Sequence, residues 1–244
     1  MKRIAISLTL TATALFANVT EHEKALVQNI LKSTTIEKVR KSPISGFYET
    51  YLPNGQLLYV NPFTELIFFG EIYTAGGKNL TTSPRSSWKG ELTKKKLEDV
   101  SLNAVKEVSL SVGFNGGNED YTIVMFTDPQ CPYCIKAEKF LRTKKASIEY
   151  VYFVAMKNHR MAPKMIETIL SSKEPRLAIE SYVDGKTIKD ISSPEAKEQA
   201  KRMEAFAISN RIKGTPNFMV FDKSGKAVEF IEGANLEKLS NYVK

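Results

Sequence analysis

The chain has 244 residues, of which 42% are hydrophobic and 10% aromatic, so it carries apolar material for one large or two modest cores and shows no bias toward disorder. The formal net charge is +8, but the basic run at Lys94, Lys95 and Lys96 is flanked by acidic residues and does not form a stripe that tracks phosphates. We therefore expect ordinary globular domains and no nucleic-acid partner.

The N-terminus has the form of a secretory signal peptide. Lys2 and Arg3 precede an apolar stretch at residues 4–16, and the small residue Ala17 follows before polar Asn18. The apolar stretch is short and rich in hydroxyl groups for a bilayer span, so an uncleaved membrane anchor is the less favoured alternative. We predict that residues 1–17 are removed by cleavage after Ala17 and that the protein is exported.

Residues 18–88 predict a small antiparallel-sheet domain with one helix. Thr20 and Glu23 have the spacing of a capping box, and apolar residues follow at helical spacing. From residue 44 the pattern changes to strands, which we expect at 44–52, 56–60 and 65–73. Such a meander buries little surface by itself and leaves backbone groups unpaired at its edges, so it offers a pairing surface for a second copy of the chain.

A domain boundary follows this sheet. Residues 75–89 are rich in glycine and serine and carry no sustained apolar period. Residues 91–110 then predict one helix with apolar side chains on one face, ended by Gly113 and the glycine pair at 116–117. We assign residues 89–115 to a linker helix between two domains.

The remaining residues, 116–244, alternate strand and helix patterns. The strand at 121–126 is continuously apolar, which is typical of a strand buried on both faces. Further strands are predicted at 148–155, 217–221 and 227–231, and helices at 163–170, 175–182, 194–211 and 236–243. The predicted fold class is α+β, with a small antiparallel-sheet domain, a linker helix and an α/β domain that contains a helical insertion.

Cys131 and Cys134 are the only cysteines, and they lie where the buried strand at 121–126 gives way to a helix. The first sulfur then lies among free backbone N–H groups at the positive end of the helix dipole, which stabilises a thiolate. Cys131 is therefore the predicted nucleophile, and Cys134, one turn further in, is the predicted resolving thiol that attacks a mixed disulfide formed at Cys131. Pro132 stiffens the first helical turn, and Tyr133 offers an aromatic face beside the sulfur, so both are candidate substrate contacts.

Two other uses of the cysteine pair are less favoured. A permanent stabilising disulfide over so short a ring would restrict the unfolded chain by only about 2 kcal/mol. A metal site lacks partners, because His22 and His159 are the only histidines and neither has ligand spacing to the pair. We predict no metal and no cofactor beyond the redox-active Cys131–Cys134 pair itself.

A proline loop is the second candidate element. Gly214-Thr215-Pro216 stands just before the strand predicted at 217–221, where a proline is unusual unless it opens the strand or forms a cis bond. A cis Pro216 would place the backbone of Thr215 beside Cys131. A simple turn proline is the alternative.

The run Phe126-Thr127-Asp128-Pro129-Gln130-Cys131-Pro132-Tyr133-Cys134, with the Gly214-Thr215-Pro216 loop, resembles the DsbC/DsbG family of bacterial periplasmic disulfide isomerases. The similarity covers nearly the whole chain after the signal segment. It implies a cystatin-like N-terminal domain that forms a V-shaped homodimer, and a helix that joins it to a thioredoxin-like catalytic domain.

The resemblance also implies roles for individual residues. Cys131 would be the attacking cysteine, Cys134 the resolving one, Pro216 the cis-proline, and Thr215 the residue that touches the substrate backbone. The implied location is the periplasm, the implied substrates are misfolded or oxidised exported proteins, and the implied reductant is a membrane electron donor of the DsbD type.

The predicted activity is reduction or isomerisation of non-native disulfides, and several alternatives stay open. These are a dimeric disulfide oxidase, a reductase of sulfenylated cysteines, to which the DsbG-like Pro132-Tyr133 dipeptide points, an apocytochrome c reductase, and a holdase chaperone without redox chemistry. Thioredoxins carry a buried carboxylate for proton transfer six positions before the first cysteine. That position is Met125 here, so the sequence assigns no group to this role.

Overall fold

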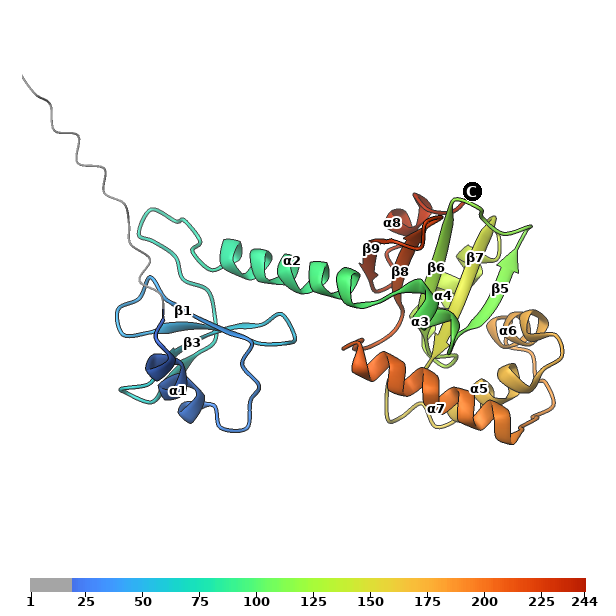
Figure 1. Ribbon diagram of the computed structural model, residues 1–244, viewed down its shortest axis with the longest axis horizontal. Coiled ribbons are helices and arrows are strands. Elements are labelled where there is room, and N and C mark those ends of the chain that lie inside the picture. Colours follow the sequence, from blue (N-terminus) through green and yellow to red (C-terminus); the bar gives the residue numbers. More distant parts are fainter. Residues whose placement is uncertain (1–18) are drawn as a thin grey trace, which may run out of the picture. The chain divides into compact units, whose positions relative to one another are not determined.

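The computed structural model describes residues 19–244, and the predicted signal segment at 1–17 therefore lies outside the described residues. The chain divides into two compact units, one ending at Leu92 and the other spanning Thr93–Lys244 (Figure 1). Within residues 19–244, no helix is long and apolar enough to cross a membrane.

The N-terminal unit contains one helix and a four-stranded antiparallel sheet. The capping box is confirmed: the Thr20 side chain accepts a hydrogen bond from the Glu23 amide at 3.2 Å, and the Glu23 carboxylate accepts one from the Thr20 amide at 2.8 Å. The strands pair in chain order. The elements are α1 (Glu21–Ile30), β1 (Lys38–Lys41), β2 (Tyr48–Tyr51), β3 (Leu57–Asn61) and β4 (Leu66–Phe68).

The N-terminal sheet differs from the prediction at its two edges. Strand β1 was not predicted, because its sequence Lys-Val-Arg-Lys carries charge in place of an apolar alternation, as edge strands often do. The predicted strand at 44–52 begins only at Tyr48, since Gly46 adopts a φ of +78° in a preceding turn. The predicted strand at 65–73 is shortened to β4.

Strands β2 and β3 are buried on both faces. On one face, Val27 and Leu31 pack against apolar side chains that include Leu58 and Val60. On the other face, Trp88 packs edge-on against Tyr51, with ring centroids 5.6 Å apart, and the Trp88 indole N–H donates to the carbonyl of Leu52 at 2.9 Å. The small sheet therefore has a core on each side.

The helix expected at 91–110 is wrongly placed. Helix α2 spans Thr82–Asp99, so it begins nine residues earlier, and it is followed by the short helix α3 (Leu102–Lys106) and strand β5 (Leu110–Phe114). Proline is compatible with a first helical turn, so Pro84 does not delay the start, and the packing of Trp88 stabilises that end. The glycine at 113, taken as a helix stop, lies instead within β5.

The C-terminal unit is built on a five-stranded mixed sheet with the order β5-β7-β6-β8-β9. Strand β6 is parallel to β7 and antiparallel to β8, and the central strands are almost fully buried, as the apolar run predicted. The strands predicted here are confirmed with ends shifted by up to three residues. They are β6 (Tyr121–Thr127), β7 (Ala146–Tyr152), β8 (Asn217–Asp222) and β9 (Ala227–Glu232).

Helices complete this unit. Helix α4 (Pro132–Leu141) connects β6 to β7, and the predicted helical insertion between β7 and β8 is made of α5 (Ala162–Ser171), α6 (Pro175–Val183) and α7 (Pro194–Ser209) (Figure 1). Helix α8 (Leu236–Ser240) is shorter than the predicted 236–243. The α+β fold class, with an α/β domain that contains a helical insertion, is confirmed.

Candidate active site

Cys131 is the N-cap residue of helix α4, directly after β6 and a tight turn. Its backbone is extended, with φ −75° and ψ 120°, and Pro132 follows at the first helical position. The first N–H groups of a helix have no helical acceptor, so the Cys131 sulfur lies where those groups and the helix dipole favour negative charge. The residue is 6% exposed, which leaves a narrow approach to the sulfur.

Cys134 lies one turn further along α4 and is 1% exposed. Burial raises the pKa of the Cys134 thiol to about 12, while the Thr127 hydroxyl, the backbone at Asp128 and the Thr215 hydroxyl lower this pKa by less. Both cysteines are free thiols in this structure. The two sulfurs therefore have different environments, and the inner one is a protonated thiol at neutral pH.

The proline loop lies beside the first cysteine. The Thr215–Pro216 peptide bond is cis, as the position of the loop predicted. The Cys131 thiol donates to the carbonyl oxygen of Thr215 at 3.5 Å. The Asn217 side chain holds the loop by donating to the carbonyl of Gly214 at 2.9 Å. The structure thus brings Cys131, Thr215 and Pro216 together.

The dipeptide between the cysteines faces solvent. Pro132 is exposed, and the Tyr133 side chain is 66% exposed although it is large and aromatic. Since each is the direct neighbour of a cysteine, both lie at the rim of the site, where the sequence predicted contacts to substrate.

Asp128 is a site residue that sequence reasoning did not single out. It is fully buried, and its carboxylate accepts hydrogen bonds from the amides of Gln130 and Ala155, each at 2.8 Å. The same carboxylate lies 2.8 Å from the His159 ring nitrogen Nδ1. Asp128 therefore fastens the loop at 155–161 to the turn that carries Cys131. The residue stands inside the motif, but its partners Ala155 and His159 lie about thirty positions away, so no local sequence pattern predicts these contacts.

Gln130 makes the second connection to the same loop. Its side-chain oxygen accepts hydrogen bonds from the amides of Met161 and Ala162 at 2.6 and 2.7 Å. The loop also carries exposed apolar side chains, since Met156 is 57% and Met161 is 51% exposed. The loop that Asp128 and Gln130 hold in place therefore exposes two methionine side chains.

A second buried acid, Glu138, was also missed by sequence reasoning. It lies one turn after Cys134 on α4 and is 5% exposed. Burial raises the pKa of the Glu138 carboxyl to about 7. It lies four residues after Cys134, on the helix face that also carries the buried residues Ala137 and Leu141; this spacing is a weak sequence signal, because it does not by itself predict the burial of Glu138. By contrast, Met125 is fully buried and contributes no ionisable group.

The arrangement is suited to thiol–disulfide exchange. A sulfur at a helix N-terminus can attack a disulfide, and a second thiol one turn away can attack the mixed disulfide that results. Among residues 19–244, no group of three or more His, Cys, Asp or Glu side chains is placed to hold a metal ion.

Comparison with known proteins supports this chemistry. Residues 114–243 match the family model of the thioredoxin-like domain, and residues 13–82 match that of the disulfide bond isomerase protein N-terminal domain. The thiol:disulfide interchange protein DsbC of Haemophilus influenzae is 24% identical over 202 residues, which cover 81% of each chain. The thiol:disulfide interchange protein DsbG of Pseudomonas aeruginosa is 21% identical over 145 residues, covering 57% of this chain and 53% of that protein.

Among solved structures, the catalytic domain of Proteus mirabilis ScsC aligns with 62% of this chain and 96% of its own, at 15% identity and a TM-score of 0.44. The two matched family models carry the assignment, since together they account for most of the chain and occur in the order of the two structural units. The chain belongs to the DsbC/DsbG family of thiol:disulfide interchange proteins, which are enzymes of the oxidoreductase and isomerase type.

Proposed function

We propose that this protein reduces and isomerises non-native disulfides in exported proteins in the periplasm, with Cys131 as nucleophile and Cys134 as resolving thiol. The observation that carries the proposal is the asymmetry of the pair. Cys131 lies at the helix N-terminus beside a backbone acceptor, whereas burial raises the pKa of Cys134 to about 12.

The first chemical step is attack by the Cys131 thiolate on one sulfur of a substrate disulfide. A bond forms between Cys131 and that sulfur, the substrate S–S bond breaks, and the other substrate sulfur leaves as a thiolate. The second step has two branches. Attack by another substrate thiol gives a rearranged substrate, and attack by Cys134 gives a reduced substrate and a Cys131–Cys134 disulfide.

The burial of Cys134 supports the isomerase branch. A thiol attacks only as its thiolate, and the raised pKa of Cys134 keeps that form scarce at neutral pH. Attack by Cys134 therefore requires the prior loss of its proton, and a substrate thiol can reach the mixed disulfide at Cys131 before that happens. An oxidase would need no such delay, since it starts from the disulfide form.

The surroundings of Cys131 suit a polypeptide substrate. The carbonyl of Thr215 lies next to the sulfur and is an acceptor for an extended backbone, with Pro216 beside it. Exposed apolar side chains are Tyr133, which lies between the cysteines, and Met156 and Met161, on the loop that Asp128 and Gln130 tie to the turn before Cys131. Such side chains bind unfolded segments without demanding one sequence.

The N-terminal unit supports a homodimer. Among the strands of residues 19–244, β4 pairs with β3 alone and so has a free edge, and exposed apolar side chains lie on and beside it. We call these the edge patch, made of Phe63 at 70% exposure, Leu66 at 57%, Phe69 at 68% and Tyr73 at 58%. An unprotected edge with apolar side chains is a template for pairing with a second copy of the chain.

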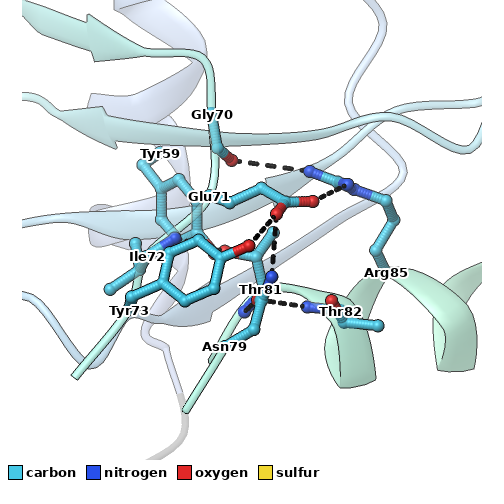
Figure 2. A network of polar contacts seen from close by, with 9 residues as sticks. All are labelled: Tyr59, Gly70, Glu71, Ile72, Tyr73, Asn79, Thr81, Thr82 and Arg85. Carbon is cyan, nitrogen blue, oxygen red and sulfur yellow. Dashed lines mark hydrogen bonds and ion pairs between the residues drawn. The ribbon is translucent and has the colours of Figure 1, made fainter. Parts of the chain in front are cut away.

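A polar network holds the segment after β4 in place (Figure 2). The Glu71 carboxylate accepts hydrogen bonds from the Tyr73 hydroxyl at 2.7 Å and the Asn79 side chain at 2.8 Å, and it pairs with Arg85 at 3.0 Å. The Thr81 hydroxyl, in turn, lies 2.7 Å from the Tyr59 hydroxyl in the buried sheet. This network supports a pre-formed edge patch.

An isomerase of this kind works only while its cysteines are reduced, so the proposal includes a reductant. In the periplasm the Cys131–Cys134 disulfide left by each reductive turnover must be reopened by another dithiol. A membrane electron donor of the DsbD type is the proposed partner.

The test is refolding of a small protein with scrambled disulfides, followed by its recovered activity. The wild type is expected to accelerate recovery, Cys131→Ala to abolish the acceleration, and Cys134→Ser to retain part of it, since a substrate thiol can still resolve the mixed disulfide. Recovery that survives Cys131→Ala would overturn the assignment. If Cys131→Ala still suppresses aggregation of an unfolded protein, binding and redox chemistry are separate activities of one surface.

Acid trapping of thiols in whole cells, followed by alkylation, separates the isomerase from the oxidase. A mostly reduced Cys131–Cys134 pair is expected. A mostly oxidised pair would contradict the proposal and indicate a dimeric oxidase.

A further inference from the structure

A small cavity lies beneath the redox site, between Cys134 and Glu138. Its volume is about 20 Å³, which is room for one water molecule. Cys134 and Glu138 are four residues apart on α4 and so lie on the same face of the helix. The remaining walls come from the end of β6, the turn after it, β7 and the insertion helices, with Thr127, Tyr152, Ile169, Ile179, Tyr182 and Val183 among them.

The cavity wall contains polar atoms without partners. Glu138 Oε1 and the Tyr182 hydroxyl are buried and make no hydrogen bond to other residues. A buried water is held by two to four polar partners, and the cavity offers these two together with the Cys134 thiol. One water in this cavity would have the Glu138 carboxyl, the Tyr182 hydroxyl and the Cys134 thiol among the polar groups of its walls.

Among residues 19–244, no basic side chain forms an ion pair with Glu138 that would explain its burial. Its neighbour Arg142 pairs with Asp184 at 2.6 Å, and Glu180 pairs with Arg176 at 3.0 Å. The Tyr150 hydroxyl faces the carboxyl but lies outside hydrogen-bond geometry. A buried carboxyl costs several kcal/mol when charged and unpaired, which is a large cost for a residue with only a structural role.

Burial and several neighbouring groups determine the pKa of Glu138. Burial is the main cause that raises the pKa of Glu138 to about 7; the Tyr150 hydroxyl and Arg142 lower it, and Glu180 raises it further. The titratable or charged groups that face the carboxyl or its cavity are Asp128 from the turn after β6, Cys134 from α4 and Arg142 at its C-cap, Tyr150 and Tyr152 from β7, and Glu180 and Tyr182 from α6. This places the titration of Glu138 near neutral pH, where a proton acceptor works best.

We propose that Glu138 takes the proton of the Cys134 thiol, through one water molecule in this cavity, when Cys134 attacks the mixed disulfide at Cys131. The inference rests on the proposed function and goes beyond it by naming the base for the resolving step. Met125 supplies no acid from β6, and Glu138 supplies one from α4.

The Cys134 S–H bond breaks, and its proton passes through the water to the Glu138 carboxylate. The Cys134 sulfur forms a bond to the Cys131 sulfur, the bond from Cys131 to the substrate sulfur breaks, and the substrate leaves as a thiolate that solvent protonates. Over the two steps together, Cys131 and Cys134 lose two electrons to form their disulfide, and the substrate disulfide gains two.

The experiment separates the two steps with an aromatic disulfide, dithiobis(nitrobenzoate), whose released thiolate is coloured. The first thiolate reports attack by Cys131 and depends on reagent concentration, whereas the second reports attack by Cys134 and does not. In Glu138→Gln, we expect the first phase to be unchanged and the second to slow roughly a hundredfold at pH 7, the lower end of general acid–base effects.

The pH profile distinguishes a proton acceptor from a structural residue. In the wild type, the second-phase rate should rise with pH and level off near pH 7, where Glu138 becomes ionised. In Glu138→Gln the rate should rise without that plateau, because only the Cys134 thiolate remains to respond. Glu149→Gln is the matched control, since Glu149 is equally buried but accepts hydrogen bonds from Ser109 and Ser111 and does not line the cavity.

The outcomes also separate this inference from the proposed function. If the wild type showed no first phase of thiolate release, the proposed function itself would be wrong. A normal first phase with an unchanged second phase in Glu138→Gln would overturn only the role of Glu138. Should Glu138→Gln not fold, carboxyl-carbon NMR of the wild type decides instead. Glu138 is expected to titrate near pH 7 with a midpoint that shifts when the Cys131–Cys134 disulfide forms, and an unshifted midpoint would contradict the inference.

Discussion

The Cys131 thiol and the Thr215 carbonyl oxygen lie 3.5 Å apart, although 84 positions separate the two residues in the chain. The contact uses the hydrogen of the free thiol. Cys131 loses this hydrogen when it ionises to the attacking thiolate, and it has none to donate in the mixed disulfide, so the Thr215 carbonyl is then an unoccupied acceptor for a backbone N–H.

Replacing Asp128 by alanine should loosen the loop at 155–161. The buried carboxylate satisfies two backbone amides and contacts His159, and removing it leaves buried donors unpaired. We expect the free energy of unfolding to fall by roughly 3 kcal/mol, measured by urea denaturation, with faster hydrogen exchange at Ala155. Asp120→Ala, which removes only an exposed pair with Lys244, should change neither. Equal effects of the two substitutions would show that Asp128 does not hold the loop.

The stability of the C-terminal unit should depend on pH through Glu138. The folded state raises the pKa of Glu138 from 4.5 to about 7, so this group stabilises the fold fully below pH 4.5 and loses that contribution as the pH rises through 7. The expected loss is on the order of 3 kcal/mol. Denaturation at pH 5 and pH 8 should show the loss in the wild type and not in Glu138→Gln. Parallel pH profiles of the two proteins would contradict it.

Charge in the edge patch should separate the proposed dimer. Phe69 is 68% exposed and lies beside the free edge of β4, so Phe69→Asp adds a charge that pairing would have to bury. Sedimentation equilibrium should give a dimer for the wild type and a monomer for the variant at micromolar concentration. Ile208→Asp is the control, because Ile208 is equally exposed but lies in the C-terminal unit. Dissociation by both variants, or by neither, would place the interface elsewhere.

The sequence predicted the parts of the site that depend on local pattern. The apolar run at 121–126 identified a buried strand, and a helix after the cysteines followed from chain order, so the N-cap position of Cys131 and the burial of Cys134 could be foreseen. The cis bond before Pro216 followed from a proline at the start of a strand. The catalytic roles of these residues stay predictions that the experiments above address.

The features that the sequence did not reveal depend on contacts between distant segments. Helix α2 begins at Thr82 because Trp88 packs on the small sheet, and β5 forms because β7 offers a partner. The helical pattern at 91–110 predicts neither the packing of Trp88 on the small sheet nor the pairing of β5 with β7. Likewise, Glu138 looks like an ordinary charged residue of a helix until the packing of α6 and β7 buries it.

The two hydrogen bonds from the start of α5 to Gln130 give the insertion an unusual anchor. Met161, the N-cap residue of α5, offers no side-chain cap, and the first amides of that helix are satisfied instead by a residue of the turn that carries Cys131. A helix capped from another segment cannot fray unless that segment moves. The redox turn and the start of the insertion are therefore tied by two hydrogen bonds, and a displacement of one segment relative to the other must break them.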